Sequence, residues 1–202
     1  MGRVALPVRE DAMKRRAASI LLLLVLAIFA RTTFAAEISG VTFSDNVSVD
    51  GTAMKLNGVG LFRYAVVFKV YVAALYLGAG ATPDHVLDEV PKRLEVEYLR
   101  GFRGPEFGDA GDKVLAQNVS PATVAAIRAR LDRMNSLYED VKPGDRSALT
   151  YVPGHGTELS INGRSKGWVE GADFAAAYFQ IWLGAHPLSD SFRDQLLTPL
   201  QK

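Results

Sequence analysis

The feature that most restricts the fold of this chain is a stretch at residues 61–77 that contains neither glycine nor proline. The stretch is rich in valine, tyrosine and phenylalanine, the residue types that favour β-strands. Its 17 residues exceed the usual strand length of about 3–10. The chain must therefore bend or reverse within it, and we expect the reversal near residues 64–66.

Strand and turn signals continue on both sides of this stretch. Asp50-Gly51 is typical of a hairpin turn, and Asn57-Gly58 predicts a second turn. Apolar and polar residues alternate at residues 94–99, which predicts a half-buried strand. Two further strands are expected at residues 149–152 and 158–161.

Helical signals occur between and after these strands. Ser120-Pro121 is a helix start, and apolar residues then recur every three or four positions over residues 124–138. Further helices are expected at residues 83–90 and 173–183, and Ser189 caps a last one. Strands and helices follow no βαβ rhythm, so the fold class is α+β: an antiparallel sheet with helices on one face.

The charge of the chain is divided unevenly. Residues 1–36 carry six Lys or Arg against two Asp or Glu, a net charge of +4. The remaining 17 basic and 20 acidic residues give residues 37–202 a net charge of −3. A mildly acidic body argues against a nucleic-acid partner, because such a protein needs clustered Lys and Arg to neutralise phosphates.

The basic N-terminal segment is typical of a secretory signal peptide. Positive residues at 13–16 precede an apolar run at 20–30, and small residues follow at 33–36. The 11 apolar residues span about 17 Å as a helix, short of the ~30 Å bilayer core, so we expect no permanent membrane span. Cleavage after Ala35 or Ala36 would leave residues 37–202 as one periplasmic or secreted domain.

Two alternatives remain for this segment, a buried N-terminal helix and an uncleaved membrane anchor. Met13 stands directly before the positive residues, so residues 1–12 are interpreted as an over-extended start.

Several chemistries are excluded by residue types. The chain has no cysteine, so it lacks a disulfide framework, a thiolate nucleophile and cysteine-based metal sites. His85, His155 and His186 are far apart and match no metal-ligand spacing. The loop at residues 153–157 lacks the Lys-Ser/Thr of a phosphate-binding loop. We therefore expect neither a metal nor a cofactor.

Arg63 is the most informative charged residue, because it lies within sequence expected to form core strand. Burying an unpaired guanidinium is costly, so Arg63 needs an anionic partner from the protein or from a ligand. The structural alternative is an arginine at the end of a strand whose guanidinium is satisfied by groups of the protein or by solvent.

Several segments resemble the chalcone isomerase-like superfamily, in particular its bacterial secreted branch, over about residues 40–198. Each segment is weak alone, and the combination is specific. The matching parts are LNGVGL at residues 56–61, Arg63, FKVYVAALYL at residues 68–77, Gly144-Asp145, YVPG at residues 151–154, Gly156-Thr157, Phe174, IWLG at residues 181–184 and Pro187.

The resemblance implies an open-faced β-sandwich, in which a large antiparallel sheet is covered by helices with a ligand cleft between them. Plant members of the superfamily cyclise chalcones, whereas related members without that activity bind fatty acids through an arginine and a tyrosine. Carried over to this sequence, Arg63 matches the anion-binding arginine, Tyr71 is nearer to the fatty-acid-binding pattern, and Asn118 matches the asparagine of the enzymes. The ligand's apolar tail is expected among Val66, Phe68, Tyr178 and Trp182 or their neighbours.

Three functions follow from this comparison. The first is non-catalytic binding of a fatty acid or similar amphipathic anion, with its carboxylate on Arg63 and Tyr71. The second is an isomerase or intramolecular lyase, in which Arg63 stabilises an oxyanion and Tyr71 donates a proton. The third is a structural or assembly factor with a vestigial cleft. Most of the polar network of the enzymes has no counterpart here, which favours binding.

Overall fold

The computed structural model describes residues 35–201, so most of the predicted signal segment lies outside the described residues. The first described strand, β1, begins at Ala35 and therefore includes both predicted cleavage positions. Two hydrophobic clusters lie within residues 35–201, and together they supply the core that this part of the chain needs to fold by itself.

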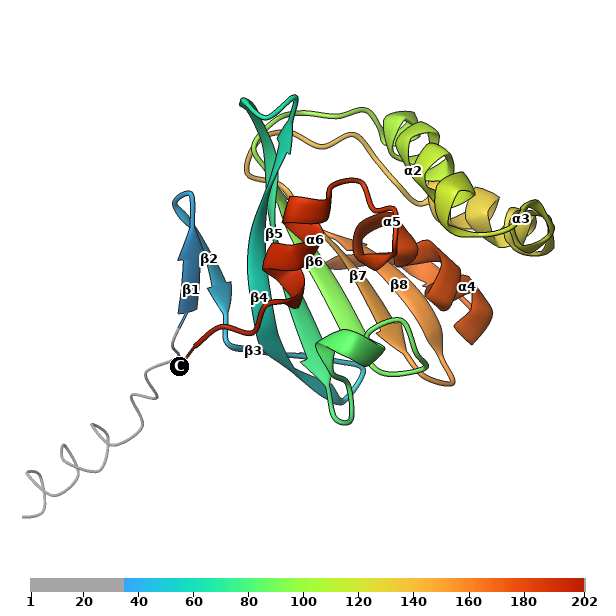
Figure 1. Cartoon of the computed structure of the whole chain (residues 1–202), viewed down its shortest axis with the longest axis horizontal. Coiled ribbons are helices and arrows are strands. Elements are labelled where there is room, and N and C mark those ends of the chain that lie inside the picture. Colours follow the sequence, from blue (N-terminus) through green and yellow to red (C-terminus); the bar gives the residue numbers. More distant parts are fainter. Residues whose placement is uncertain (1–34, 202) are drawn as a thin grey trace, which may run out of the picture. The chain divides into compact units, whose positions relative to one another are not determined.

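A seven-stranded antiparallel sheet forms the centre of the structure (Figure 1). Each strand pairs with the next one along the chain, from β3 to β9. The predicted antiparallel sheet is thus confirmed. Its strands are β3 (Asn46–Val49), β4 (Thr52–Tyr64), β5 (Phe68–Gly78), β6 (Lys92–Tyr98), β7 (Arg146–Val152), β8 (Gly156–Ile161) and β9 (Arg164–Val169).

The helices pack with one face of this sheet into the larger cluster, and Figure 1 shows α5 and α6 over the strands with α2 and α3 at the right. They are η1 (Pro83–His85), α2 (Gly104–Asn118), α3 (Pro121–Ser136), α4 (Ala172–Tyr178), α5 (Gln180–Leu183) and α6 (Asp190–Leu197). The opposite face packs with the small hairpin of β1 (Ala35–Ile38) and β2 (Val41–Ser44) in a second cluster that contains Phe43 and Tyr76.

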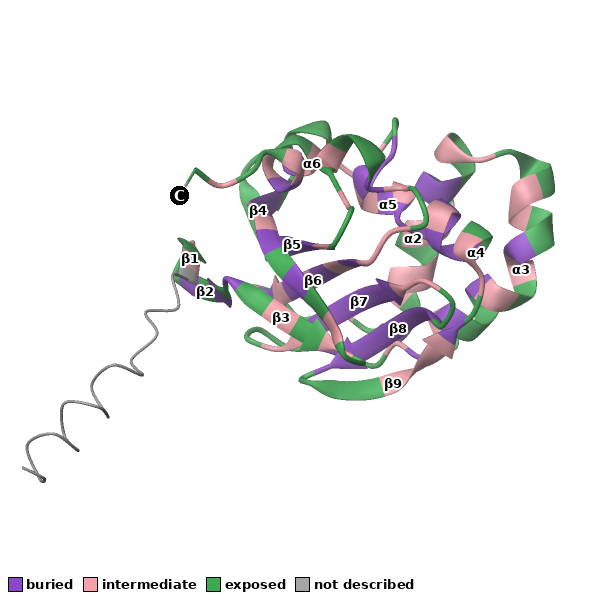
Figure 2. Cartoon of the chain, turned by 90° about the horizontal axis from the view of Figure 1, so that it is seen from below, coloured by how far each residue is buried: buried purple, intermediate pink, exposed green. Residues whose placement is uncertain are grey.

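Strand β5 is buried on both faces. Ala73, Leu75 and Leu77 belong to the helix-side cluster, whereas Val72 and Ala74 belong to the other. Double burial explains why this strand is almost continuously apolar rather than alternating. Figure 2 shows the same burial for β7 and β8, while β9 at the sheet edge is exposed at its start and half-buried over most of the rest.

The predicted reversal in the long apolar stretch is confirmed. Strand β4 ends at Tyr64, which pairs with Phe68 at the start of β5. The turn needs left-handed backbone at Ala65 (φ 48°) and Val66 (φ 67°), although neither is a glycine. The usual glycine or asparagine signal of such a turn is therefore missing from the sequence.

The turn predicted at Asn57-Gly58 is wrong, because β4 continues through both residues with a register shift between Leu56 and Gly58. The end of α6 packs here: Asn57 Nδ2 donates to the Leu196 carbonyl at 2.7 Å. A Cβ on Gly58 would collide with the Leu196 carbonyl oxygen and lie 2.7 Å from that of Gln195. The glycine thus serves close packing of a helix on a strand rather than a turn.

The predicted helices are found with changes at their ends. Ser120 caps α3, accepting a hydrogen bond from the Thr123 N–H at 3.1 Å, and Ser189 caps α6. The helix predicted at residues 173–183 is divided into α4 and α5 at Phe179, whose side chain is fully buried. The helix predicted at residues 83–90 is only the single turn η1. No helix among residues 35–201 has the length and apolar character to cross a bilayer.

Replacing Gly58 by alanine should destabilise the domain by about 2–3 kcal/mol, because the added methyl group meets backbone carbonyls that cannot rotate away. Urea unfolding of Gly58→Ala against the parent measures this difference. The matched control is Lys55→Ala, an exposed position of the same strand, which should change stability by about 0.5 kcal/mol or less. Equal stability of the two variants would contradict the assigned packing.

Candidate functional site

An apolar cavity of about 880 Å³ lies between the sheet and the helices. Its volume is within the range of small-ligand sites, about 300–1,000 Å³. The sheet contributes Phe62, Val70, Tyr71, Leu94, Val96, Tyr98 and Leu149, and the helices and the segments that follow them contribute Phe107, Tyr138, Tyr178, Ile181, Trp182 and Leu188. The walls suit a hydrocarbon chain, because few polar atoms reach them.

One side of the cavity follows strand β6 and its continuation. Leu94, Val96, Tyr98 and Arg100 all line it, which is the two-residue alternation of one strand face. At ~3.3 Å per residue, the part of this wall within β6, from Leu94 to Tyr98, is about 13 Å long, and Arg100 follows in the bend after the strand. The cavity is therefore long and runs from apolar residues to a charged end.

The charged end of the cavity is its mouth, lined by Tyr64, Phe68, Arg100 and Glu106. The exposed Arg100 donates through Nε to the Lys69 carbonyl at 3.0 Å, and its guanidinium lies 5.3 Å from the Phe68 ring centre. These contacts fix the guanidinium at the rim while leaving it free to meet an anion.

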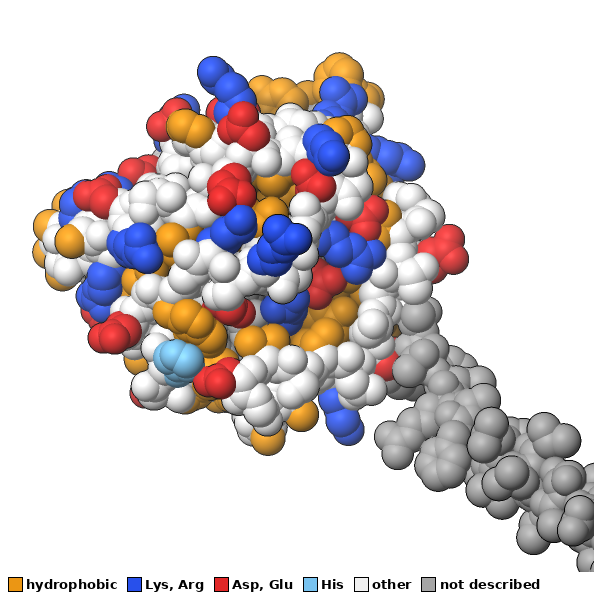
Figure 3. Space-filling view, turned by 180° about the vertical axis from the view of Figure 1, so that it is seen from behind, with side chains coloured by type: hydrophobic (Ala, Val, Ile, Leu, Met, Phe, Trp, Pro, Cys, Tyr) orange, Lys and Arg blue, Asp and Glu red, His pale blue; other side chains and the backbone are white. Residues whose placement is uncertain are grey.

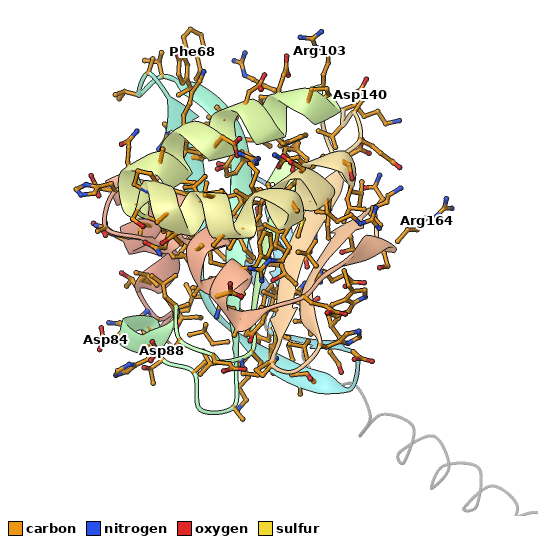
Figure 4. All side chains as sticks on the ribbon, turned by 90° about the vertical axis from the view of Figure 1, so that its right-hand side faces the viewer. Phe68, Asp84, Asp88, Arg103, Asp140 and Arg164 are labelled. Carbon is orange, nitrogen blue, oxygen red and sulfur yellow. The ribbon has the colours of Figure 1, made fainter. Side chains whose placement is uncertain are left out.

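Glu106 is already engaged by its own neighbour at this rim. It accepts the backbone N–H of Arg103 at 2.9 Å and pairs with the Arg103 guanidinium at 3.2 Å. These hydrogen bonds lower the pKa of Glu106. Figure 4 shows Phe68 and Arg103 at the same end of the molecule. Arg100 is thus a cation at the mouth that forms no ion pair with a carboxylate of residues 35–201.

Hydroxyl groups supply the polarity inside the cavity. The hydroxyls of Tyr98 and Ser147 share a hydrogen bond of 2.6 Å, and those of Tyr138 and Tyr178 lie 3.5 Å apart. The buried Tyr71 hydroxyl has no hydrogen bond of good geometry among the described residues. Burial raises the pKa of Tyr71 far above its ordinary value, although Trp182 opposes the shift. The tyrosines are therefore neutral hydroxyls at physiological pH, able to donate or accept but not to act as anions.

Of the residues predicted at the site, Phe68, Tyr71, Tyr178 and Trp182 line the cavity. Val66 does not, because the reversal of the chain places it at the exposed hairpin tip. Asn118 does not, because it holds the end of α2 to the segment after α5. Its Nδ2 donates to the His186 carbonyl at 2.7 Å, and its Oδ1 accepts the His186 N–H at 2.9 Å. The geometry makes Asn118 a structural clamp, with both ends of its amide occupied.

Arg63 is also placed differently from the prediction. It is exposed and does not line the cavity, whereas Phe62 and Tyr64 on either side of it do. Neighbouring side chains of a strand point to opposite faces, so Arg63 points away from the cavity. The reversal brings Phe62 opposite Tyr71 and Arg63 opposite Lys69. The predicted shared site of Arg63 and Tyr71 is therefore not formed.

Sequence reasoning missed Arg100, Tyr98 and Ser147. A usable signal was present, because the alternation that predicted a strand at residues 94–99 continues to Arg100 two residues after Tyr98. Ser147 offered no such signal, since it reaches Tyr98 only through the pairing of β6 with β7.

Lys92 lies on the same face of β6 as the cavity residues, at the end opposite to Arg100, and it is fully buried. Its Nζ donates to the Asp88 carbonyl at 2.7 Å and the Val90 carbonyl at 3.2 Å. The ammonium also lies 4.6 Å from the Tyr151 ring centre and 5.5 Å from that of Phe179. Desolvation lowers the pKa of Lys92 to about 8, against the smaller opposing effect of Asp88 and Glu89.

The lowered pKa of Lys92 predicts a pH-dependent difference from Lys92→Met. Above pH 8 the folded protein releases this proton, whereas the unfolded chain keeps it up to its ordinary pKa of 10.5. The unfolded state then binds more protons, so wild-type stability should rise against the variant by up to about 1 kcal/mol per unit between pH 8 and 10. Urea unfolding of both proteins across this range measures the difference. The buried tyrosines titrate in both and cancel, and a flat difference would contradict the assigned lysine environment.

Comparison with known proteins adds two findings. A family model described as chalcone isomerase-like matches residues 35–198. The crystal structure of the fatty-acid binding protein AtFAP1 from Arabidopsis thaliana is similar to this chain, with a TM-score of 0.65 and 15% sequence identity. The similarity covers 81% of this chain and 96% of that one, and at this identity it shows a shared fold. No curated protein matches the sequence.

Proposed function

Because this chain belongs to the chalcone isomerase-like family, we propose that its cavity binds an amphipathic anion of the fatty-acid type without chemical conversion. The observation that carries the proposal is the long apolar cavity with Arg100 at its mouth. The similar fold of a fatty-acid binding protein supports it.

The dimensions of the cavity fit one acyl chain. The ~30 Å hydrocarbon core of a bilayer is two acyl chains thick, so a single extended chain needs about 15 Å. The lining within β6 extends about 13 Å from Leu94 to Tyr98, and Arg100 lies beyond that end of the strand, so this wall is comparable in length to one such chain. Burying the chain removes apolar surface from water, which stabilises the complex.

We assign the anionic group to the mouth of the cavity and to Arg100, rather than to Arg63. A carboxylate in the interior would meet only neutral hydroxyls and would lose its hydration without a compensating charge. At the mouth, Arg100 offers a charge-assisted hydrogen bond, and water still reaches the carboxylate. The Tyr71 hydroxyl, which has no hydrogen bond of good geometry within residues 35–201, can bond a polar substituent farther along the ligand's chain.

Mass spectrometry of organic extracts from the protein purified out of the periplasm tests whether a ligand is present. We expect a near-stoichiometric acyl chain with an anionic end. Parallel titration of residues 35–202 with cis-parinaric acid provides the affinity. An empty protein that also fails to bind this probe would overturn the proposed function.

Arg100→Gln should weaken the binding of a fatty acid by about tenfold, because one charge-assisted contact at an exposed rim is lost. The corresponding fatty alcohol has no charge, so its affinity should change much less. Competition against cis-parinaric acid measures both affinities. Arg164→Gln is the matched control, since Arg164 is an exposed arginine of β9 outside the cavity lining. Equal losses in the two variants would argue against Arg100 as the anion-binding residue.

The isomerase alternative requires a cation and a proton donor beside the same substrate atom. Arg63 and Tyr71 do not form this pair, and Arg100 lies at the rim beside Lys69, two positions beyond the pairing of Tyr71 with Tyr98. Tyr71 is held protonated by burial and could only donate.

Incubation with naringenin chalcone at neutral pH should therefore show conversion near the spontaneous rate. The disappearance of chalcone absorbance measures this rate, and protein-free buffer is the control. Turnover well above the control would favour catalysis over binding.

We also propose export to the periplasm, on the basis of the basic, apolar and small-residue segments at residues 13–36. A periplasmic location would place the cavity between two membranes that supply acyl chains. N-terminal sequencing of the exported protein tests this location, with Ala36 or Glu37 as the expected first residue.

A further inference from the structure

The tip of the β4–β5 hairpin exposes a continuous group of large hydrophobic side chains. Tyr64 is 68% exposed, Val66 83%, Val67 71% and Phe68 49%. They are the large hydrophobic residues with exposed side chains among residues 35–201. The tip is the upper end of β4 and β5 in Figure 1, and contiguous exposed apolar residues of this kind mark contact surfaces.

The residues at the tip do not suit the backbone conformation of the turn. Val66 has φ 67° and Ala65 has φ 48°, in the left-handed region where glycine or asparagine is favoured. A β-branched valine is among the least suited residues for this conformation, and its side chain gains nothing from the core because it is exposed. We therefore expect the strained and exposed Val66 to contact a binding partner outside the folded domain.

Basic residues form a collar behind this tip. Arg63 and Lys69 face each other directly across the hairpin, and neither side chain has an ion pair within the described residues. Arg100 lies beside them, bonded to the Lys69 carbonyl. Residues 51–83 contain no Asp or Glu, so the hairpin offers these cations no acidic neighbour. Glu106, at the same rim, is held by Arg103.

Like charges opposite each other on a strand pair are destabilising, so the collar favours an external anion. Figure 3 shows hydrophobic side chains at the upper edge of the molecule with Lys and Arg side chains beside them. A tip that ends in apolar side chains and is backed by cations is complementary to a bilayer surface, which is anionic outside and apolar beneath.

We propose that the β4–β5 tip docks on an anionic lipid bilayer. Val66 and Val67 enter the boundary between headgroups and acyl chains, while Arg63 and Lys69 bind lipid phosphates. A protein partner is a poorer match, because stable interfaces use about 20–30 residues a side and the tip consists of residues 64–68. Tyr64 and Phe68 also line the cavity mouth, so docking places this opening at the lipid.

Docking would give the cavity a direct route for an amphipathic ligand. That consequence rests on the proposed function, whereas docking itself does not. Vesicle binding and binding of cis-parinaric acid are therefore measured separately, and the failure of one leaves the other standing.

Co-sedimentation of residues 35–202 with vesicles tests the docking surface. We expect binding to equimolar phosphatidylcholine and phosphatidylglycerol, much weaker binding to phosphatidylcholine alone, and a loss of binding as salt is raised. Val66→Asp/Val67→Asp should abolish binding without lowering the melting temperature, because both side chains are exposed and aspartate suits the left-handed backbone at Val66 better than valine does.

The collar is tested by Arg63→Gln/Lys69→Gln, which should weaken binding by about 30-fold if each charge contributes as membrane-surface cations do. The matched control is Lys55→Gln/Arg164→Gln, which removes the same charge at exposed positions away from the tip. Equal effects of the two pairs of substitutions would show that net charge alone attracts the protein to the vesicles, and would overturn the proposed role of Arg63 and Lys69.

A tryptophan reporter, Val67→Trp, detects insertion directly, through a blue shift of its fluorescence on the mixed vesicles. The absence of binding by the parent protein, or binding that Val66→Asp/Val67→Asp leaves intact, would overturn the proposal. Sedimentation analysis without lipid tests whether the tip instead binds a second copy of the chain. Self-association that Val66→Asp/Val67→Asp abolishes, together with failure to bind vesicles, would assign the tip to that second copy.

Discussion

The burial of strand β5 on both faces is the constraint on which the rest of the structure depends. Its side chains enter the helix-side cluster and the cluster under β1 and β2 in alternation, so both packing layers meet at this strand. Neighbouring strands must then place apolar residues on the helix side in register with it. The cavity exists where the helices stand away from that face, between the side chains of β4 to β7 and those of α2 to α5.

The alternation of side chains along the strands decides which residues belong to the cavity. In β4, the register shift between Leu56 and Gly58 changes which residues face the helices, so that Leu56 and Leu61 share one face and Phe62 lies on the other. Arg63 then points away from the cavity because it follows Phe62. In β6 the same alternation runs from Leu94 to Tyr98, and Arg100, in the bend that follows the strand, lines the mouth of the cavity.

Charge and polarity are separated along the molecule in a way that suits an amphipathic ligand. Buried tyrosine hydroxyls remain neutral because burial raises their pKa, and Lys92 is enclosed by carbonyls and aromatic rings at the far end. Cations without a carboxylate partner among residues 35–201 gather at the other end, around the cavity mouth and behind the apolar hairpin tip. The proposed ligand and the proposed bilayer surface use the same order of groups, an anion followed by hydrocarbon.

The sequence by itself determined the α+β class, the antiparallel sheet, the reversal within residues 61–77 and the caps of α3 and α6, because these follow from periodicity, strand length and local hydrogen bonding. It also identified Tyr71, Tyr178 and Trp182, which line the cavity. Only the tertiary structure decided that Asn57-Gly58 is a bulge under α6, that Arg63 lies outside the cavity and that Arg100 lies at its mouth. A register shift reverses the face of every residue beyond it, and its position depends on a helix 138 residues away.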